Sequence, residues 1–235
     1  MGVYSNWQIK DAIGRGHIVC YPLIEKNIAG SSLDVTLGEW YYRTERTSSS
    51  GFYNPFDKKD VQRYFDGPYR AEKHQDWAKA NGRQLFAGIP VNHPIIVLRP
   101  GERILGHTHE FIGIKAPGTS TLQARSTWGR SGVSACMDAG WGDPGYVNRW
   151  TMEIYNLNQH ESVVLPVGER IAQMVFYETG PVEDEYSKLS GKYQSDLSSD
   201  LKTIIKHWRP EHMLPQAYKD ARQSPKKISG LTGSR

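Results

Sequence analysis

The segment PIIVLRPGERILGHTHEFIGIKAPG, residues 94–118, contains two apolar runs of strand length, each followed by a Pro-Gly pair. The runs PIIVL and RILGHTHEFIGI are rich in β-branched and other apolar residues, as is typical of β-strands. Arg-Pro-Gly at 99–101 and Ala-Pro-Gly at 116–118 supply the backbone conformations that tight turns need. The segment therefore predicts two strands and favours a fold that is mainly β.

The pattern of short strands and Gly/Pro corners continues on both sides of this segment. Downstream, the runs TLQARSTW, WTMEIYNL, SVVLP and RIAQMVF alternate with further turn signals at 143–145 and 166–168. Upstream, HIVCYPLI predicts a strand. In SSLDVTLG, Leu33, Val35 and Leu37 alternate with polar residues, which predicts a half-buried strand. Many short strands of this kind indicate a sandwich, a barrel or a jelly roll.

Helices are expected at few places. Ser5 and Gln8 have the S-x-x-Q form of a capping box, which predicts a short helix from that point. Residues 44–83 are charged and aromatic, and they predict an insertion with one or two short helices. We expect one domain over residues 1–196 that contains this insertion, followed by a helical and basic extension over 197–235.

Charge and cysteine content limit the partners and the compartment. Residues 201–235 contain eight Lys or Arg and two Asp or Glu, so their net charge is eight minus two, or +6. The net charge of the whole chain is +4. Because aromatic residues are sparse there, we expect a solvated terminus and no nucleic-acid site. Cys20 and Cys136 show no paired spacing, and no apolar leader or membrane-spanning stretch occurs. The sequence predicts a cytoplasmic protein without a membrane partner.

Two clusters contain residues suited to a nucleotide. ARSTWGR, residues 124–130, combines two guanidinium groups with two hydroxyls, which match phosphate oxygens; an ordinary surface strand is the alternative. DAGWGDPGY, residues 138–146, holds three glycines and a proline. These residues fix an unusual backbone path that can present N–H and C=O groups to a flat ligand. A plain Asp-Pro-Gly turn is the alternative there.

Glu153 is the strongest candidate for chemistry. Period two in RWTMEIY places Trp150, Met152 and Ile154 on one strand face and Glu153 on the other. A carboxylate among apolar neighbours is costly unless it is paired or used, so Glu153 is either functional or solvent-facing on an outer strand. Arg130 is the expected partner that would orient it.

Zinc chemistry does not fit the sequence. Zinc-dependent base deaminases use H-x-E and P-C-x-x-C motifs, and no C-x-x-C occurs here. A metal site of another kind is an alternative at His107, His109 and Glu110, because strand alternation places both histidines on one face. No P-loop motif occurs either.

Taken together, the motifs resemble those of the dCTP deaminase family, within the dUTPase-like superfamily. The similarity runs from about residue 5 to residue 194, leaving out 44–83 and the tail. SSLDVTLG resembles the family's S-x-D-x-x-L-G motif. LRPGERILGHTHEFIGI resembles its P-G-E-x-x-L-G-x-T-x-E segment, and residues 125–176 follow its core block without a gap. The resemblance implies a distorted jelly-roll, or dUTPase-like β-barrel, with a few short helices that assembles as a homotrimer.

The resemblance also implies site residues. Glu153 would be the general base, with Arg130 and Ser126 supporting catalysis. The substrate-binding residues would be Arg125, Ser126, Thr127, Ala139, Asp143, Gln173, Tyr186, Lys192 and Tyr193. The implied reaction is deamination of dCTP to dUTP by a water molecule that Glu153 activates. Mg²⁺ would be bound through the triphosphate of the nucleotide, with no metal-ligating residues assigned in the protein. dTTP would be an inhibitor.

Other reactions and roles remain open at this point. Asp143 lies where dUTPases carry their water-activating Asp, so a dUTPase or a bifunctional enzyme that forms dUMP is the first alternative. A non-catalytic, nucleotide-sensing trimer is the second. Asp138 stands where the family has Thr, and Asp196 stands where the family commonly has Gln. Because both residues are carboxylates, the preferred cytosine nucleotide stays open.

Overall fold

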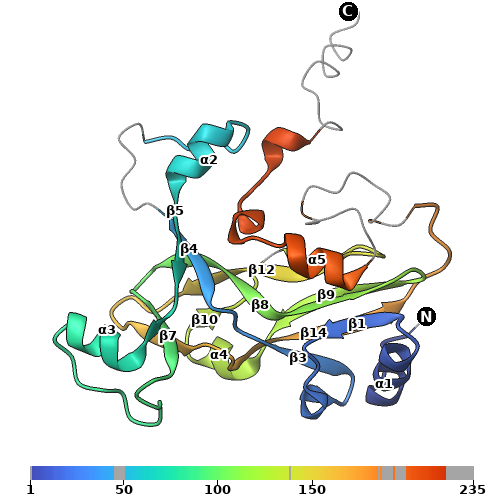
Figure 1. Ribbon diagram of the computed structural model, residues 1–235, viewed down its shortest axis with the longest axis horizontal. Coiled ribbons are helices and arrows are strands. Elements are labelled where there is room, and N and C mark those ends of the chain that lie inside the picture. The colour runs from blue at the N-terminus through green and yellow to red at the C-terminus, as the bar shows by residue number, and fades with distance from the viewer. Residues whose placement is uncertain are drawn as a thin grey trace, which may run out of the picture.

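The described part of the chain forms three antiparallel β-sheets (Figure 1). A computed structural model describes residues 2–44, 51–137, 139–184, 186, 193 and 200–220. The six-stranded sheet has the order β10-β12-β8-β4-β5, with β1 also paired to β8. Its strands are β1 (Ile18–Tyr21), β4 (Trp40–Thr44), β5 (Phe65–Arg70), β8 (Arg103–Ile114), β10 (Val133–Ser134) and β12 (Val147–Asn156). The prediction of a mainly β fold is confirmed.

Two further sheets complete the framework. The five-stranded sheet has the order β11-β9-β14-β3-β2 and consists of β2 (Ile28–Ala29), β3 (Ser32–Thr36), β9 (Gly118–Ala124), β11 (Trp141–Gly142) and β14 (Arg170–Glu178). The three-stranded sheet has the order β13-β7-β6 and consists of β6 (Glu72–Lys73), β7 (Pro94–Leu98) and β13 (Val163–Pro166).

The helices of the described residues are short. They are α1 (Asn6–Gly14), α2 (Lys58–Tyr64), α3 (His74–Ala80), α4 (Ser126–Arg130), α5 (Leu201–His207), and the 3-10 turns η1 (Glu25–Asn27), η2 (Pro210–Met213) and η3 (Ala217–Lys219). The Ser5 hydroxyl accepts from the Gln8 N–H, and the Gln8 side chain accepts from the Ser5 N–H, so the capping box is confirmed. No helix among the described residues is both long and apolar enough to cross a bilayer.

The main core lies between the two larger sheets. Leu33, Met174 and Phe176 from the five-stranded sheet meet Ile104 and Met152 from the six-stranded sheet, and all are buried. Close packing of this apolar surface is the main favourable contribution to folding.

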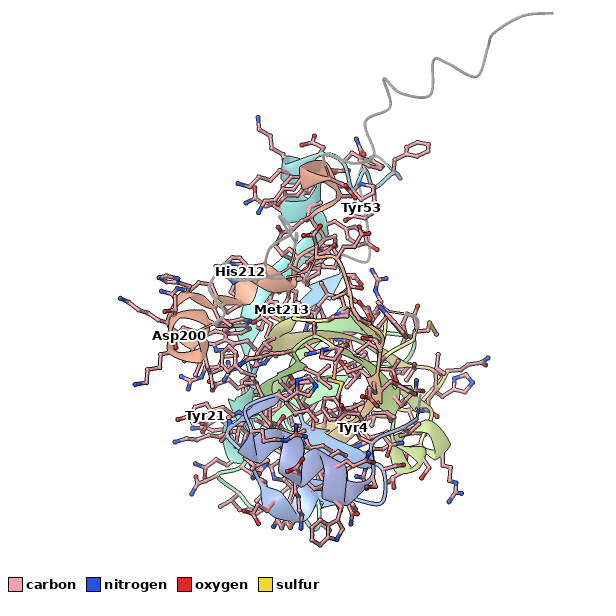
Figure 2. The ribbon with its side chains drawn as sticks, turned by 90° about the vertical axis from the view of Figure 1, so that its right-hand side faces the viewer. Tyr4, Tyr21, Tyr53, Asp200, His212 and Met213 are labelled. Carbon is pink, nitrogen blue, oxygen red and sulfur yellow. The ribbon has the colours of Figure 1, made fainter. Side chains whose placement is uncertain are left out.

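A second hydrophobic cluster covers the other face of β8 and β12. Its buried members are Tyr42, Val61, Phe65, Leu105, Phe111, Val147, Ile204, Trp208, Met213 and Leu214. They come from the six-stranded sheet, from the 44–83 insertion and from residues 201–214. Figure 1 shows α5 over this sheet, and Figure 2 shows Met213 between the sheet and the insertion. The insertion and the C-terminal residues thus build one small core together.

The structure corrects two expectations about strands. β3 was expected to be half-buried, but its polar residues Asp34 and Thr36 are buried as well. Thr36 donates its N–H and its hydroxyl to Glu110, at 2.9 and 2.7 Å, so a long-range partner makes that burial tolerable. In TLQARSTW, the strand β9 ends at Ala124 and α4 begins at Ser126, so the second half of this run is helical.

The insertion contains two short helices, α2 and α3, in agreement with the one or two that were expected, and also the strands β5 and β6, which the sequence pattern did not predict. β5 pairs with β4 and extends the six-stranded sheet, although it contains Gly67 and Pro68. Pro is tolerated on an edge strand, where its missing N–H is not needed by a neighbour. The proposed boundary between residues 196 and 197 stays a prediction.

Candidate active site

A cavity of about 300 Å³ lies beside the middle of β12. It is lined by Leu105, Ala139, Trp141, Asp143, Tyr146, Trp150, Thr151, Glu153, Tyr186, Tyr193, Met213 and Pro215. Five of these residues belong to the predicted site: Ala139, Asp143, Glu153, Tyr186 and Tyr193. The fold therefore gathers the predicted base, the turn carboxylate and two predicted tyrosines around one space.

Glu153 enters the cavity from the strand face opposite the main core. Met152 and Ile154 are fully buried in that core, and Glu153 between them is half-buried, as period two predicts. Its partner across the ladder is Leu105 of β8. Glu153 Oε2 is buried in this apolar setting. A carboxylate held in this way on a paired strand is well placed to act on a ligand in the cavity.

The loop before β12 follows a tightly constrained backbone path. The Leu122 N–H donates to the Gly140 carbonyl at 2.7 Å, and the Thr119 hydroxyl donates to the Gly142 carbonyl at 2.7 Å. A Cβ at Gly142 would lie 2.4 Å from Trp150 Cη2, so only glycine fits. The glycines thus hold a fixed backbone path here, with the exposed residues Ala139 and Asp143 in the cavity lining. That this path presents backbone groups to a ligand stays a prediction.

Aromatic rings form one wall of the cavity. The Tyr146 ring packs edge-on against Trp150 and Tyr186, with centroid distances of 5.4 and 5.2 Å. The Tyr186 N–H donates to the Pro144 carbonyl at 2.8 Å, and the Tyr193 N–H donates to the Tyr186 hydroxyl at 3.3 Å. Burial raises the pKa of Tyr146, so this phenol stays protonated. Such a wall suits a flat, uncharged ring.

The predicted phosphate-binding residues form a separate group around α4. Arg125, the N-cap residue of α4, forms an ion pair with Asp34 of β3, and Arg170 Nη1 lies 3.1 Å from the same carboxylate. Gln173 is paired with Asp34 across the β14–β3 ladder. Asp34 is 8% exposed, and the two guanidinium groups compensate its charge.

This second group does not line the Glu153 cavity within one chain. Arg125, Ser126, Thr127, Arg130 and Gln173 are absent from the residues that surround it. Ser126, Thr127 and Arg130 are exposed on α4. The expected contact between Arg130 and Glu153 stays a prediction, and Lys192, Asp138 and Asp196 lie outside the described residues.

The sequence of this chain is similar to those of known dCTP deaminases. The family model described as dCTP deaminase-like matches residues 3–179. A protein of Methanopyrus kandleri named "dCTP deaminase, dUMP-forming" is 32% identical over 203 residues, which cover 83% of this chain and 92% of that protein. The chain belongs to the dCTP deaminase-like family. A Nanoarchaeum equitans protein of the same name is 27% identical and covers 85% of this chain and 96% of its own length.

A solved structure supports the dCTP deaminase-like fold. The 2′-deoxycytidine 5′-triphosphate deaminase of Agrobacterium tumefaciens superposes with a TM-score of 0.51 at 16% identity, covering 74% of this chain. The chain spans about half of that protein, 48% of its length. At this identity the likeness concerns the fold alone.

The metal site left open at His107, His109 and Glu110 is not supported in this dCTP deaminase-like chain. His107 Nδ1 lies 2.7 Å from the Thr108 carbonyl, and Nε2 accepts from the Trp40 N–H at 3.2 Å, so both ring nitrogens are used. Glu110 binds Thr36. Within the part of the chain that the structure describes, no three His, Cys, Asp or Glu side chains are grouped to hold a metal ion.

A larger cavity, about 660 Å³, lies between the insertion and β7, and several of its charged groups form ion pairs. Arg43 forms an ion pair with buried Glu102, and Arg63 lies 2.6 Å from Asp60. The smaller cavity combines a half-buried carboxylate with an aromatic wall, and it is therefore the better candidate for catalysis.

Sequence reasoning missed several residues at the cavity and in the group around α4. Asp34 and Arg170 were not singled out, although Asp34 stands in the quoted S-x-D motif, which could have indicated it. Met213 and Pro215 were missed because they lie in the tail, beyond any motif used.

Proposed function

We propose that this chain is a dUMP-forming dCTP deaminase, which hydrolyses dCTP to ammonia, pyrophosphate and dUMP. The observation that carries the proposal is that Glu153 and Asp143 line one aromatic cavity. Two carboxylates in different surroundings can serve two hydrolytic steps. The names of the relatives also favour this bifunctional alternative over the dUTP-releasing deaminase expected from the sequence.

In the first step Glu153 acts as the general base. Its carboxylate takes a proton from water, and the resulting hydroxide attacks C4 of the cytosine ring. The protonated Glu153 then donates its proton to the C4 amine, the C–N bond breaks, and ammonia leaves with dUTP as the product. Since the cavity walls are largely apolar, the charges that develop in this step are poorly screened by water and respond strongly to nearby dipoles.

In the second step Asp143 acts on a second water molecule. Asp143 orients this water and accepts its proton while the oxygen attacks the α-phosphorus of dUTP. The bond to the bridging oxygen breaks, and pyrophosphate leaves together with dUMP. The exposed position of Asp143 at the rim suits this step, because the phosphates of a ligand with its base inside must extend outward.

Mg²⁺ is expected on the triphosphate. Because the described residues present no three-ligand cluster, the phosphate oxygens and water would supply most of its ligands, as is usual for Mg²⁺ bound to nucleotides. The ion would neutralise charge on the leaving pyrophosphate. Asp143, at the rim of the cavity, is the described carboxylate that would face this Mg²⁺–triphosphate complex.

A homotrimer would complete the site. The α4 residues Ser126, Thr127 and Arg130 are exposed and lie apart from the cavity of their own chain. A neighbouring copy could therefore supply the triphosphate-binding group and Arg130 to each Glu153 cavity. Sedimentation velocity would test the trimer. Mixing Arg130→Ala with Glu153→Gln protein would test sharing, because activity should return in mixed trimers.

The reaction is tested by incubating the protein with dCTP and Mg²⁺ and separating the products. We expect dUMP, ammonia and pyrophosphate from the wild type. Glu153→Gln should lose deamination by about 10²- to 10⁴-fold while still hydrolysing added dUTP. Asp143→Asn should accumulate dUTP. Glu25→Gln, which removes an exposed carboxylate on η1, is the matched control.

Other products would change the conclusion. Accumulation of dUTP by the wild type would indicate a deaminase that releases dUTP, as expected from the sequence. Turnover of dUTP but not of dCTP would indicate a dUTPase. Binding of nucleotides without turnover would indicate the sensor. Adding dTTP to the assay tests the expected inhibition.

A further inference from the structure

The second hydrophobic cluster and the candidate cavity share a wall. Leu105 of β8 and Met213 of η2 belong to the cluster and also line the cavity that contains Glu153. Across the strands, Tyr42 is the ladder partner of Leu105, and Leu105 is the ladder partner of Glu153. Because directly opposed residues point to the same side of a sheet, these three form a row over β4, β8 and β12. The small core on this sheet face therefore continues directly into the cavity.

The C-terminal extension, residues 200–220, supplies one part of this core, although it lies beyond the part of the chain that the family model matches. Trp208 anchors it on the sheet. The Trp208 ring centroid lies 4.8 Å from that of His107, and the Arg149 guanidinium of β12 lies 4.6 Å from the Trp208 ring. A half-buried cation on an aromatic face is a favourable contact. It fixes the extension on β12 five residues before Met213.

The extension also contacts a residue of the aromatic wall. The Gln216 N–H donates to the Tyr193 hydroxyl at 3.4 Å. From the other side, Asn148 Nδ2 donates to the Tyr193 carbonyl at 3.0 Å. Tyr193, which lines the cavity, is thus held between β12 and the extension.

The insertion supplies another part of the same core. Val61 of α2 and Phe65 of β5 are both buried in the second cluster. A Cβ at Gly67 of β5 would lie 3.0 Å from Tyr42 Cδ1, so the insertion strand lies directly against the Tyr42 ring. Burial raises the pKa of Tyr42, and the nearby Glu211 carboxylate of η2 adds to this effect. Figures 1 and 2 also show η3, the end of the described extension, beside α2.

Neither segment brings a charged side chain to the cavity. Among the residues that the structure describes, the insertion contributes none to the lining, and the extension contributes Met213 and Pro215. A thioether and a proline ring have no hydrogen-bond donor. What these two segments can give the site is therefore the position of its walls.

We propose that the insertion and the extension act as one unit that positions the wall of the active site, with Val61 and Trp208 as positioning residues. The inference rests on the proposed function. Because a packed core has few voids, a change in the second cluster displaces Leu105 and Met213. These side chains bound the space for the base, so nucleotide affinity depends on residues outside the cavity. Glu153 is held by the β8–β12 ladder, so the chemical step depends on the unit much less.

The first test compares KM and kcat for dCTP in the wild type, Val61→Ala and Ile9→Ala. Val61→Ala should raise KM by about tenfold, while kcat changes by less than about threefold. Ile9→Ala, at a fully buried position of α1 in the main core, is the control. It should lower the melting temperature at least as much and keep KM. Well below the melting temperature, KM does not depend on the folded fraction, so lost stability alone would not raise it.

Two results would overturn the proposal at this point. One is an unchanged KM in Val61→Ala. The other is an equal rise of KM in Ile9→Ala, which would show that any loss of core packing disturbs the site.

Trp208 is tested with its own conservative variant. Trp208→Ala should raise KM as Val61→Ala does, and Trp208→Phe, which keeps a ring on Arg149, should bring KM back toward the wild-type value. Trp208→Leu takes the place of Trp208→Ala if that protein does not fold. Lys206→Ala, an exposed change on α5, is the control and should keep KM. A Trp208→Ala protein that melts at a lower temperature but keeps KM would overturn the positioning role.

A double-mutant cycle tests whether the two segments act as one unit. If Val61→Ala and Trp208→Ala displace the same wall, the double variant should raise KM by clearly less than the product of the two single effects. An increase equal to that product would show two independent effects and overturn the single unit.

Calorimetric binding separates this inference from the proposed reaction. Dissociation constants of dCTP are compared between Glu153→Gln and Glu153→Gln/Val61→Ala, and those of dTTP between the wild type and Val61→Ala. Both nucleotides should bind more weakly by similar factors in the Val61→Ala proteins, because the unit supplies position and no contact to one particular ring substituent.

The outcomes are distinguishable. If the wild type does not deaminate dCTP but Val61→Ala weakens binding, the reaction is wrong and the positioning unit is right. If the wild type deaminates dCTP and the dissociation constants do not change, only the positioning unit is wrong. Absence of binding of both nucleotides would overturn both.

Discussion

Acidification should destabilise this protein through His107, a buried histidine that the fold keeps neutral. A Cβ at Gly38 would lie 2.0 Å from His107 Cε1, and Trp208 packs on the ring. Nδ1 donates to the Thr108 carbonyl, and Nε2 accepts from the Trp40 N–H. A proton on Nε2 would face that N–H. Burial, with the Arg149 and His109 charges as further causes, lowers the pKa of His107 to about 3.

The magnitude follows from the difference between the folded and unfolded pKa values. The unfolded chain takes up a proton on this side chain below about pH 6.5, whereas the folded chain does so only near pH 3. The stabilisation is present above pH 6.5 and is lost as the pH falls through this window. Each pH unit costs about 1.4 kcal/mol, so lowering the pH from 7 to 5 should reduce the free energy of unfolding by about 2 kcal/mol through His107 alone.

Urea denaturation at pH 7 and pH 5 measures this loss. His107→Gln removes the titrating group, so the variant should lose about 2 kcal/mol less than the wild type between the two pH values, although it is less stable at pH 7. His207→Gln, an exposed histidine change at the end of α5, is the control and should follow the wild type. Equal pH dependence of the wild type and His107→Gln would refute the reasoning.

Two further substitutions test the packing around the sites. Gly142→Ala should lower the free energy of unfolding by about 1–3 kcal/mol and reduce deamination, because the new Cβ would lie 2.4 Å from the Trp150 ring; thermal melting and the product assay check it. Glu102→Ala should cost about 3 kcal/mol in urea denaturation, since it leaves the half-buried guanidinium of Arg43 without its ion pair. Glu39→Ala, at an exposed ion pair, should cost less than about 1 kcal/mol, and an equal cost at both pairs would contradict the argument.

The sequence by itself determined the local elements and the strand faces. Strand runs such as 94–98 and 103–114 were predicted within a residue, because apolar content and Pro-Gly corners act over a few neighbouring positions. The same local rule placed Glu153 opposite Met152 and Ile154. The capping box at Ser5 and Gln8 also depends only on residues three apart.

Only the tertiary structure decided which residues share a site. Glu153 and Met213 line one cavity because the chain returns over β12 after sixty residues, and no periodicity describes such a return. Asp34 meets Arg170 across the β3–β14 pairing, which likewise made β3 buried on both faces. The physical reason is the distance along the chain over which each effect acts. Backbone propensity and side-chain alternation are properties of neighbouring residues. Burial, ion pairing and cavity walls depend on which distant segments the sheets bring into contact.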